Sequence, residues 1–464
     1  MTRHLTEGKP FALILQFSIP VLLGYLFQQF YNVTDTVIVG KLLGFRSLAA
    51  VGSTGAVNFL IIGFAAGLCT GFTIPVSQRF GAQDYTSMRR YVCNAAYLSV
   101  CFSLLMALLT VFFCRPLLRI MKTPDDIISE ATAYIRIIFA GIPTIFLYNM
   151  TAGTIRALGD SKTPVYFLVA SSVLNITLDL VFIMVCKWGI QGAAYATVIS
   201  QGISGAACLF YMARKFEILI CSGNEKQFSC RHSLSLLSVG IPMGLQYSIT
   251  AIGSVIMQTA INTLGSAAVA AVTASYRVSG FFCTVFDALG TTMATYGGQN
   301  TGARKFERLG EGIRDSMLIG TVYSAVVFAV YFFFGQHVLR LFINGPELNI
   351  IHDAKLFLLE ISSCYVFLAG VNIIRFMIQG MGFSMFAILS GVFEMTARTL
   401  AGIWIIPRFG FISAGLADPL AWIFADLFLV PAFLLCRRHL YKKYTGTEHI
   451  QQPAHAAIRP ADNA

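Results

Sequence analysis

Charged residues are scarce in this 464-residue sequence. Asp, Glu, Lys and Arg together make up 12% of it, whereas hydrophobic residues make up 56%. Soluble domains carry about 25% charged residues. The composition therefore excludes an ordinary soluble domain and predicts an all-α integral membrane protein with little mass outside the bilayer.

The sequence also lacks the motifs of several functional classes. It contains no P-loop, no nucleophile elbow and no His-Glu-x-x-His pattern, so we expect no enzyme activity. The 11 cysteines are scattered and form no Cys-x-x-Cys pair, which indicates packing residues and not metal ligands. The net charge of +11 does not predict a nucleic-acid partner, because the basic residues cluster in short loops, as membrane orientation requires.

Apolar runs separated by short charged loops predict about twelve membrane-spanning helices. They lie near 11–40, 47–79, 91–114, 127–151, 163–186, 189–213, 234–262, 267–299, 315–336, 352–380, 384–406 and 412–436. The longest polar interruption, 215–233, is expected to be an inter-lobe loop between a six-helix unit at 1–214 and another at 234–436. A basic and then disordered tail is expected at 437–464.

The two units repeat one another. Residues 43–51 recur at 264–272, 78–82 recur at 299–303, and 189–194 recur at 410–415, each pair 221 positions apart. Since six is an even number of spans, both copies face the same way across the membrane. The repeat therefore predicts two parallel six-helix lobes around a central cleft, the architecture of alternating-access carriers.

Loop charges predict the orientation. Lys and Arg are about twice as frequent in the loops on the side of the two termini as in the loops on the other side. By the positive-inside rule we expect both termini to be cytoplasmic.

Asp35 is the single charged residue between Phe11 and Gly40. An ionised carboxylate inside the bilayer costs at least about 2.5 kcal/mol. Asp35 should therefore face a cavity or carry a proton, and we interpret it as exchanging a cation, H⁺ or Na⁺, during transport. The alternative is a hydrogen bond from Asp35 to a neighbouring helix.

Four further polar residues are predicted at the depth of Asp35. Asn175 and Asp179 are one turn apart on one helix face, and Tyr134 and Thr197 lie at a similar distance from the outer helix ends, about 8–12 Å below the surface. Oxygen atoms of this kind suit a hard cation. The alternative is a set of separate helix–helix hydrogen bonds.

The C-terminal copy differs from the N-terminal copy. Its first helix, at 241–262, has no acid, and Met257 stands at the position of Asp35. Glu394 and Arg398 are one turn apart and are expected to form a neutralising ion pair. Asp418 precedes Pro419 and is either a helix-start feature or part of a site. The sequence leaves open whether this lobe contributes to transport through Arg277, Asp287, Glu394, Arg398 and Asp418.

The chain resembles the bacterial MATE (multidrug and toxic compound extrusion) transporters. The likeness covers about residues 8–436 and is carried by Pro20, by Asp35 in YNVTDTVIVG, by Asn175-x-x-x-Asp179 and Thr197, and by the motifs at 48–52 and 155–160. It implies a V-shaped cleft and exchange of H⁺ or Na⁺ for organic cations across the cytoplasmic (inner) membrane of a bacterium.

Site residues follow from the same resemblance. Asp35, Asn175, Asp179 and Thr197 match the cation or proton site of the DinF-like branch, which would also be the Na⁺ site, and Tyr134 and Asn149 match its periphery. The NorM-like branch has a glutamate in the seventh helix, where this chain has Thr250 nearby.

We therefore predict a multidrug efflux antiporter, functional as a monomer, that exports amphipathic organic cations and needs no cofactor besides H⁺ or Na⁺. The alternative is a flippase for a lipid-linked precursor or an exporter of another metabolite. A flippase for anionic precursors should line its cleft with Arg and Lys. Within the spans there are few, namely Arg136, Arg277, Arg375 and Arg398.

Overall fold

The computed structural model describes residues 4–121, 123–340 and 348–448, and nearly all of them are helical. Ten of these helices are each long and apolar enough to cross a membrane, and two bent pairs of shorter helices pass the same test together. Counting each bent pair as one span gives the twelve predicted spans. A helix satisfies all its backbone hydrogen bonds internally, which is what lipid demands.

The elements follow the chain in two sets. The N-terminal lobe contains α1 (Pro10–Leu43), α2 (Phe45–Gly81), α3 (Tyr85–Ile120), α4 (Ile128–Ala140), α5 (Ile142–Ala157), α6 (Lys162–Leu180) with the π-helical turn Val181–Val185, and α7 (Ile190–Lys215). The C-terminal lobe contains α8 (Cys230–Asn262), α9 (Ser266–Gly302), α10 (Phe306–Leu339), α11 (Leu348–Ser363), α12 (Tyr365–Gly380), α13 (Ser384–Leu400) with the π-helical turn Ala401–Ile405, α14 (Ile406–Phe409) and α15 (Phe411–Glu448).

Two spans predicted as single helices are broken. α4 and α5 meet at an angle of 43° and α11 and α12 at 48°. Pro143 follows the first break, at Gly141, and proline lacks the N–H that would continue the hydrogen-bond ladder. A side chain at Gly141 would also overlap Val198 of α7. This break therefore depends on the close approach of another helix as well as on the local sequence.

The sequence repeat extends to the backbone. Gly44 and Gly265 both have positive φ (85° and 97°) where the first and second helices of each lobe meet. Gln83 and Arg304, also 221 positions apart, have φ of 57° and 56°, a conformation that is uncommon for residues other than glycine. Each lobe also has a π-helical turn at the end of its fifth span.

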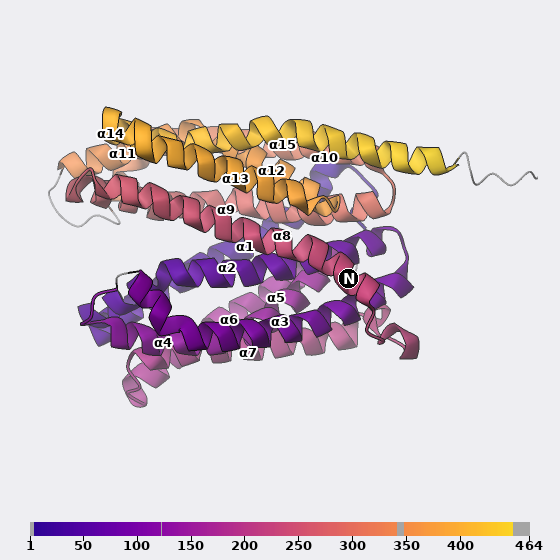
Figure 1. The fold of residues 1–464 in the computed structure, drawn as a ribbon, viewed down its shortest axis with the longest axis horizontal. Helices are drawn as coiled ribbons and strands as arrows, with labels where there is room; N and C mark the ends of the chain where they lie inside the picture. Colours follow the sequence, from indigo (N-terminus) through magenta and orange to yellow (C-terminus); the bar gives the residue numbers. More distant parts are fainter. Residues whose placement is uncertain (1–3, 122, 341–347, 449–464) are drawn as a thin grey trace, which may run out of the picture.

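The helices of the two lobes form two layers (Figure 1), and each lobe has its own hydrophobic core. The lobes exchange the starts of their first helices. Leu13, Ile14 and Phe17 of α1 belong to the core of the C-terminal lobe, whereas Leu236 of α8 belongs to the core of the N-terminal lobe. Between the layers, α2 packs along α8 and α9 packs along α1.

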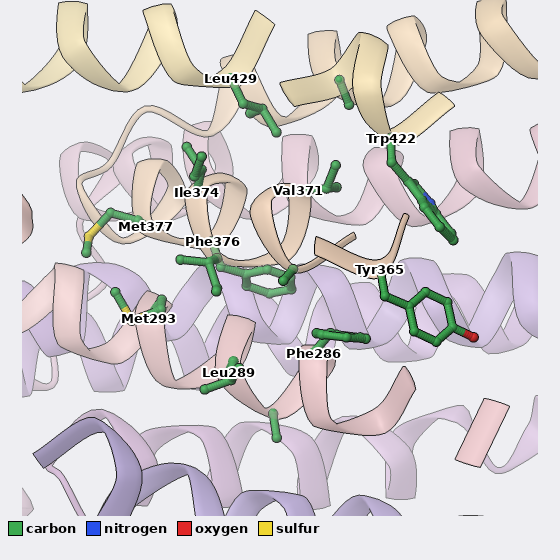
Figure 2. Packing of buried hydrophobic residues seen from close by; sticks show 14 of the residues in the cluster. Phe286, Leu289, Met293, Tyr365, Val371, Ile374, Phe376, Met377, Trp422 and Leu429 are labelled. Carbon is green, nitrogen blue, oxygen red and sulfur yellow. The ribbon is translucent and has the colours of Figure 1, made fainter. Parts of the chain in front are cut away.

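Buried side chains of the C-terminal lobe fix one face of α9. Figure 2 shows Phe286, Leu289 and Met293 of α9 on the side that faces α12, where Phe376 and Met377 lie. Because this face is occupied by the core, the opposite face of α9 is free to line the space between the lobes.

The tail is helical at its start. α15 runs through the basic residues 437–443 and ends at Glu448. The predicted disordered end, 449–464, lies outside the described residues.

Candidate functional site

Two acidic side chains from different helices meet inside the N-terminal lobe. Asp35 on α1 and Asp179 on α6 lie close enough for their carboxyl groups to interact directly. Asp179 is completely buried. The Oδ1 atoms of both carboxyls are buried and have no hydrogen-bond partner among the described residues. Asp179 stands just before the π-helical turn Val181–Val185, and such turns are frequent at functional sites.

Asn175 joins Asp179 to α7. With its amide nitrogen turned toward Asp179, Asn175 donates to Asp179 Oδ2 at 3.2 Å, and its amide oxygen accepts from the backbone N–H of Thr197 at 3.2 Å. This orientation satisfies both ends of the amide. The Thr197 hydroxyl donates to the Ala193 carbonyl at 3.1 Å, so its oxygen can still accept a hydrogen bond or bind a cation.

Two tyrosines complete this group. Tyr134 of α4 is buried and interacts electrostatically with Asp35, Asp179 and Tyr31. Tyr31 was missed from the sequence, although it lies one turn before Asp35 on the same helix face. Its hydroxyl interacts with that of Thr197. The N-terminal cluster is hereafter Asp35, Asp179, Asn175, Thr197, Tyr134 and Tyr31.

Asn149 occupies a different place from the rest of the predicted set. It lies on α5 and lines a cavity of about 270 Å³ inside the N-terminal lobe, together with Asn175, Tyr31 and Arg156. Its amide donates to the Ile145 carbonyl at 2.9 Å. The structure thus brings Asp35, Asn175, Asp179, Thr197 and Tyr134 together and puts Asn149 on the wall of the neighbouring cavity.

The C-terminal lobe holds a larger charged network than the predicted pair. Arg398 contacts Glu394 at 3.4 Å, as predicted, but Glu394 also pairs with Arg375 of α12. Arg398 Nε reaches Asp418 at 2.8 Å. Asp418 in turn accepts from the Tyr276 hydroxyl at 2.8 Å. The predicted ion pair is therefore present, but as part of a network that also includes Arg375 and Asp418.

Two other predictions for this lobe are also resolved. α15 begins at Phe411, so Asp418 lies inside the helix and the helix-start alternative is not observed. Arg277 is at an exposed position of α9, outside the network.

A second cavity, of about 640 Å³, lies beside this network. This one lies between the lobes and shares Tyr25, Gln28 and Tyr247 with the first cavity, and the two adjoining cavities are hereafter the central cleft. Its charged lining residues are Asp287, Arg375, Glu394 and Arg398. Tyr25 of α1 and Thr291 of α9 are hydrogen-bonded across the cleft at 2.8 Å.

The cluster in the N-terminal lobe offers oxygen atoms to a ligand. They come from two carboxylates, an amide and hydroxyl groups, which are ligands of hard cations. In the described ranges no group of three or more His, Cys, Asp and Glu side chains is arranged to bind a metal ion.

The family model MatE matches residues 20–181 and 242–402, one match in each lobe. The probable multidrug resistance protein YpnP of Bacillus subtilis is 30% identical over 342 residues, which cover 74% of this chain and 76% of that protein. The multidrug export protein MepA of Staphylococcus haemolyticus is 22% identical over 397 residues, covering 84% and 86%.

Solved structures show the same fold. A MATE crystal structure in complex with MaL6 has a TM-score of 0.86 at 24% identity, covering 94% of this chain and 98% of the other. The outward-facing structure of a multidrug resistance MATE family transporter of the MOP superfamily has a TM-score of 0.85 at 25% identity, covering 94% and 97%. With the two-lobed fold and both lobes matched, the chain belongs to the MATE family of membrane transporters and is not an enzyme.

Proposed function

We propose that this transporter exports amphipathic organic cations in exchange for H⁺ or Na⁺, which bind at Asp35 and Asp179. One observation carries the proposal. Two carboxyls interact inside the bilayer, and each has a buried oxygen without a hydrogen-bond partner among the described residues. Two adjacent ionised carboxylates repel each other strongly in a low-dielectric interior. A bound proton or Na⁺ removes that repulsion, so the pair has a strong affinity for one cation.

Geometry supports coupling to the central cleft. Tyr31 and Asn175 belong to the N-terminal cluster and also line the first cavity. Binding or release of a cation at the carboxyls therefore changes the wall of the cleft. Asp35 lies on α1, the start of which packs in the other lobe, so a shift of α1 connects the ion site to the inter-lobe contacts. We infer that the cation resets the lobes by alternating access.

The closed end of the cleft supports the same inference. α2 and α9 cross tightly near the chain's N-terminus, at the face predicted to be cytoplasmic. At this crossing Gln78 and Gln299 each donate to a backbone carbonyl of the other lobe at 2.9 Å. We interpret this arrangement as the outward-facing state. The names of the relatives, the probable multidrug resistance protein YpnP and the multidrug export protein MepA, agree with multidrug export.

Charge pairing disfavours the alternative, a flippase for anionic lipid-linked precursors. Arg375 and Arg398 line the cleft, but Glu394 and Asp418 neutralise them. An anionic ligand would have to displace these carboxylates.

The deciding experiment uses purified protein in vesicles loaded with a cationic dye. A proton gradient and a sodium gradient are imposed separately, and dye movement is followed in each case. Dye export driven by one of the two gradients, and lost in Asp35→Asn, supports the proposal. Dye export that needs neither gradient contradicts it.

A further inference from the structure

We propose that Asp287 binds the positive charge of the transported compound, in the half of the cleft formed by the C-terminal lobe. The inference rests on the proposed function and adds to it the residue that selects cations. In this assignment Asp35 and Asp179 bind the coupling ion, and Asp287, on a different helix, binds the substrate.

Asp287 projects from a polar stripe of α9 into the larger cavity. Thr284, Asp287 and Thr291 recur at intervals of three and four residues, so they lie on one helix face, and all three line the cavity. The opposite face carries Phe286, Leu289 and Met293 in the core (Figure 2). The side chain of Asp287 is accessible from the cavity.

The other acids near the cavity are already paired. Glu394 contacts Arg375 and Arg398, and Asp418 contacts Arg398 and Tyr276. Asp287 makes no hydrogen bond or ion pair with another residue that the structure describes. It is therefore the acid at the cavity that is free to bind a ligand.

The charge count around the cavity favours a cation. Arg375 and Arg398 supply two guanidinium groups to this region, whereas Asp287, Glu394 and Asp418 supply three carboxylates.

The exposed Arg277 precedes Asp287 on α9 by ten residues, which is about 15 Å along the helix axis. Arg277 is therefore too far away to neutralise Asp287 directly. A monovalent organic cation in the cavity would offset the excess of one negative charge.

The walls suit a cation of drug size. The cavity measures about 640 Å³, within the range of about 300–1,000 Å³ that small-molecule sites have. Tyr25, Phe59, Tyr247, Phe376 and Trp422 line it. Aromatic rings bind cations through their faces, while their area removes apolar substituents from water.

Equilibrium dialysis of purified protein in lipid nanodiscs tests this assignment. Tetraphenylphosphonium serves as the cationic probe, and triphenylphosphine oxide serves as a neutral probe with similar rings. Asp287→Asn should weaken tetraphenylphosphonium binding by about tenfold, because a charge pair in a low-dielectric site is lost, and should leave binding of the neutral probe unchanged. Asp287→Glu should stay within about threefold of the wild type.

Two controls separate this inference from the proposed function. Glu307→Gln removes an exposed carboxylate outside the cavity and should change nothing. Asp35→Asn should still bind tetraphenylphosphonium while losing ion-driven export. If Asp287→Asn does not fold, Asp287→Ser is the second neutral variant. Wild-type affinity for tetraphenylphosphonium in either neutral variant would overturn the assignment of Asp287. If the wild type showed no ion-driven export but Asp287→Asn still weakened tetraphenylphosphonium binding, antiport would be refuted and the assignment of Asp287 would stand.

Discussion

Gly81 and Gly302 occupy equivalent positions of the two repeats, and each lies against the backbone of the other lobe. A Cβ atom on Gly81 would overlap the backbone of Gln299, and a Cβ atom on Gly302 would overlap the backbone of Gln78. The two glutamines are themselves equivalent, 221 positions apart. Gln78 donates to the Gly380 carbonyl and Gln299 to the Ala157 carbonyl. The lobes are thus joined by the same contact made twice.

This contact predicts the effect of adding one methyl group. Gly302→Ala should keep α2 and α9 from closing, because overpacking at a tight crossing costs about 1–3 kcal/mol. We expect cationic dye export to fall by about tenfold and the distance between spin labels at the ends of α2 and α9 to increase. Gly55→Ala is the matched control on α2, since no atom lies within 4 Å of its added Cβ. Normal export and an unchanged distance in Gly302→Ala would contradict the role of the crossing.

The paired carboxyls of the N-terminal cluster predict a loss of coupling. Asp35→Asn and Asp179→Asn should each abolish ion-driven dye export with folded yield retained, because one carboxyl alone has no like-charged neighbour to drive cation binding. Dye efflux from vesicles measures this. Export at the wild-type rate in either variant would show that the coupling ion binds elsewhere.

Replacing Asn175 should weaken ion coupling only in part. Its amide orients the Asp179 carboxyl and carries no charge itself. Asn175→Ala should therefore reduce the dependence of export on the ion gradient while substrate binding persists, and Asn175→Gln should restore part of it. If Asn175→Ala impaired export more than Asp179→Asn does, Asn175 would be the residue essential for coupling and Asp179 the one that supports it.

The network of the C-terminal lobe predicts a loss of stability. Glu394→Gln leaves Arg375 and Arg398 facing each other without their shared carboxylate, and breaking a buried pair costs about 3–5 kcal/mol. Folded yield and melting temperature should fall markedly. The double replacement Glu394→Gln with Arg398→Met should not recover stability, because Arg375 remains buried without Glu394 and the half-buried Asp418 loses Arg398. Full recovery would indicate that Glu394 and Arg398 act as an isolated pair.

We expect the segment between the lobes to stay attached to α3 across the neutral pH range. Glu225 lies between α7 and α8 and binds Arg89 of α3 at 2.6 Å. Hydrogen bonds from Arg89 lower the pKa of the Glu225 carboxyl to about 2.

Because this pKa is depressed from 4.5, the attachment is fully stabilising above about pH 4.5 and is lost as the pH falls toward 2. Limited proteolysis of this segment should therefore be constant from pH 5 to pH 8. Arg89→Gln should increase cleavage throughout that range. A rise in wild-type cleavage near pH 6 would contradict the assignment.

The sequence by itself determined the helices, the repeat and the level of the acidic residues. A bilayer restricts the backbone to helices, so apolar length gives the spans, and the rise per residue along each span gives the depth of its side chains. Asp35, Asp179, Asn175, Thr197 and Tyr134 were therefore predicted to share a depth, and the structure brings them together.

Tertiary structure alone decided which neighbours meet at a given depth. Depth says nothing of lateral position, because a helix can turn any face toward any neighbour. Hence Tyr31 was missed, and the predicted pair Glu394–Arg398 proved to be part of a network with Arg375 and Asp418. Tertiary structure also decided that the starts of α1 and α8 pack in the opposite lobes and that the lobes cross at Gly81 and Gly302. Both features depend on how closely two backbones approach, and spacing along one chain does not specify that.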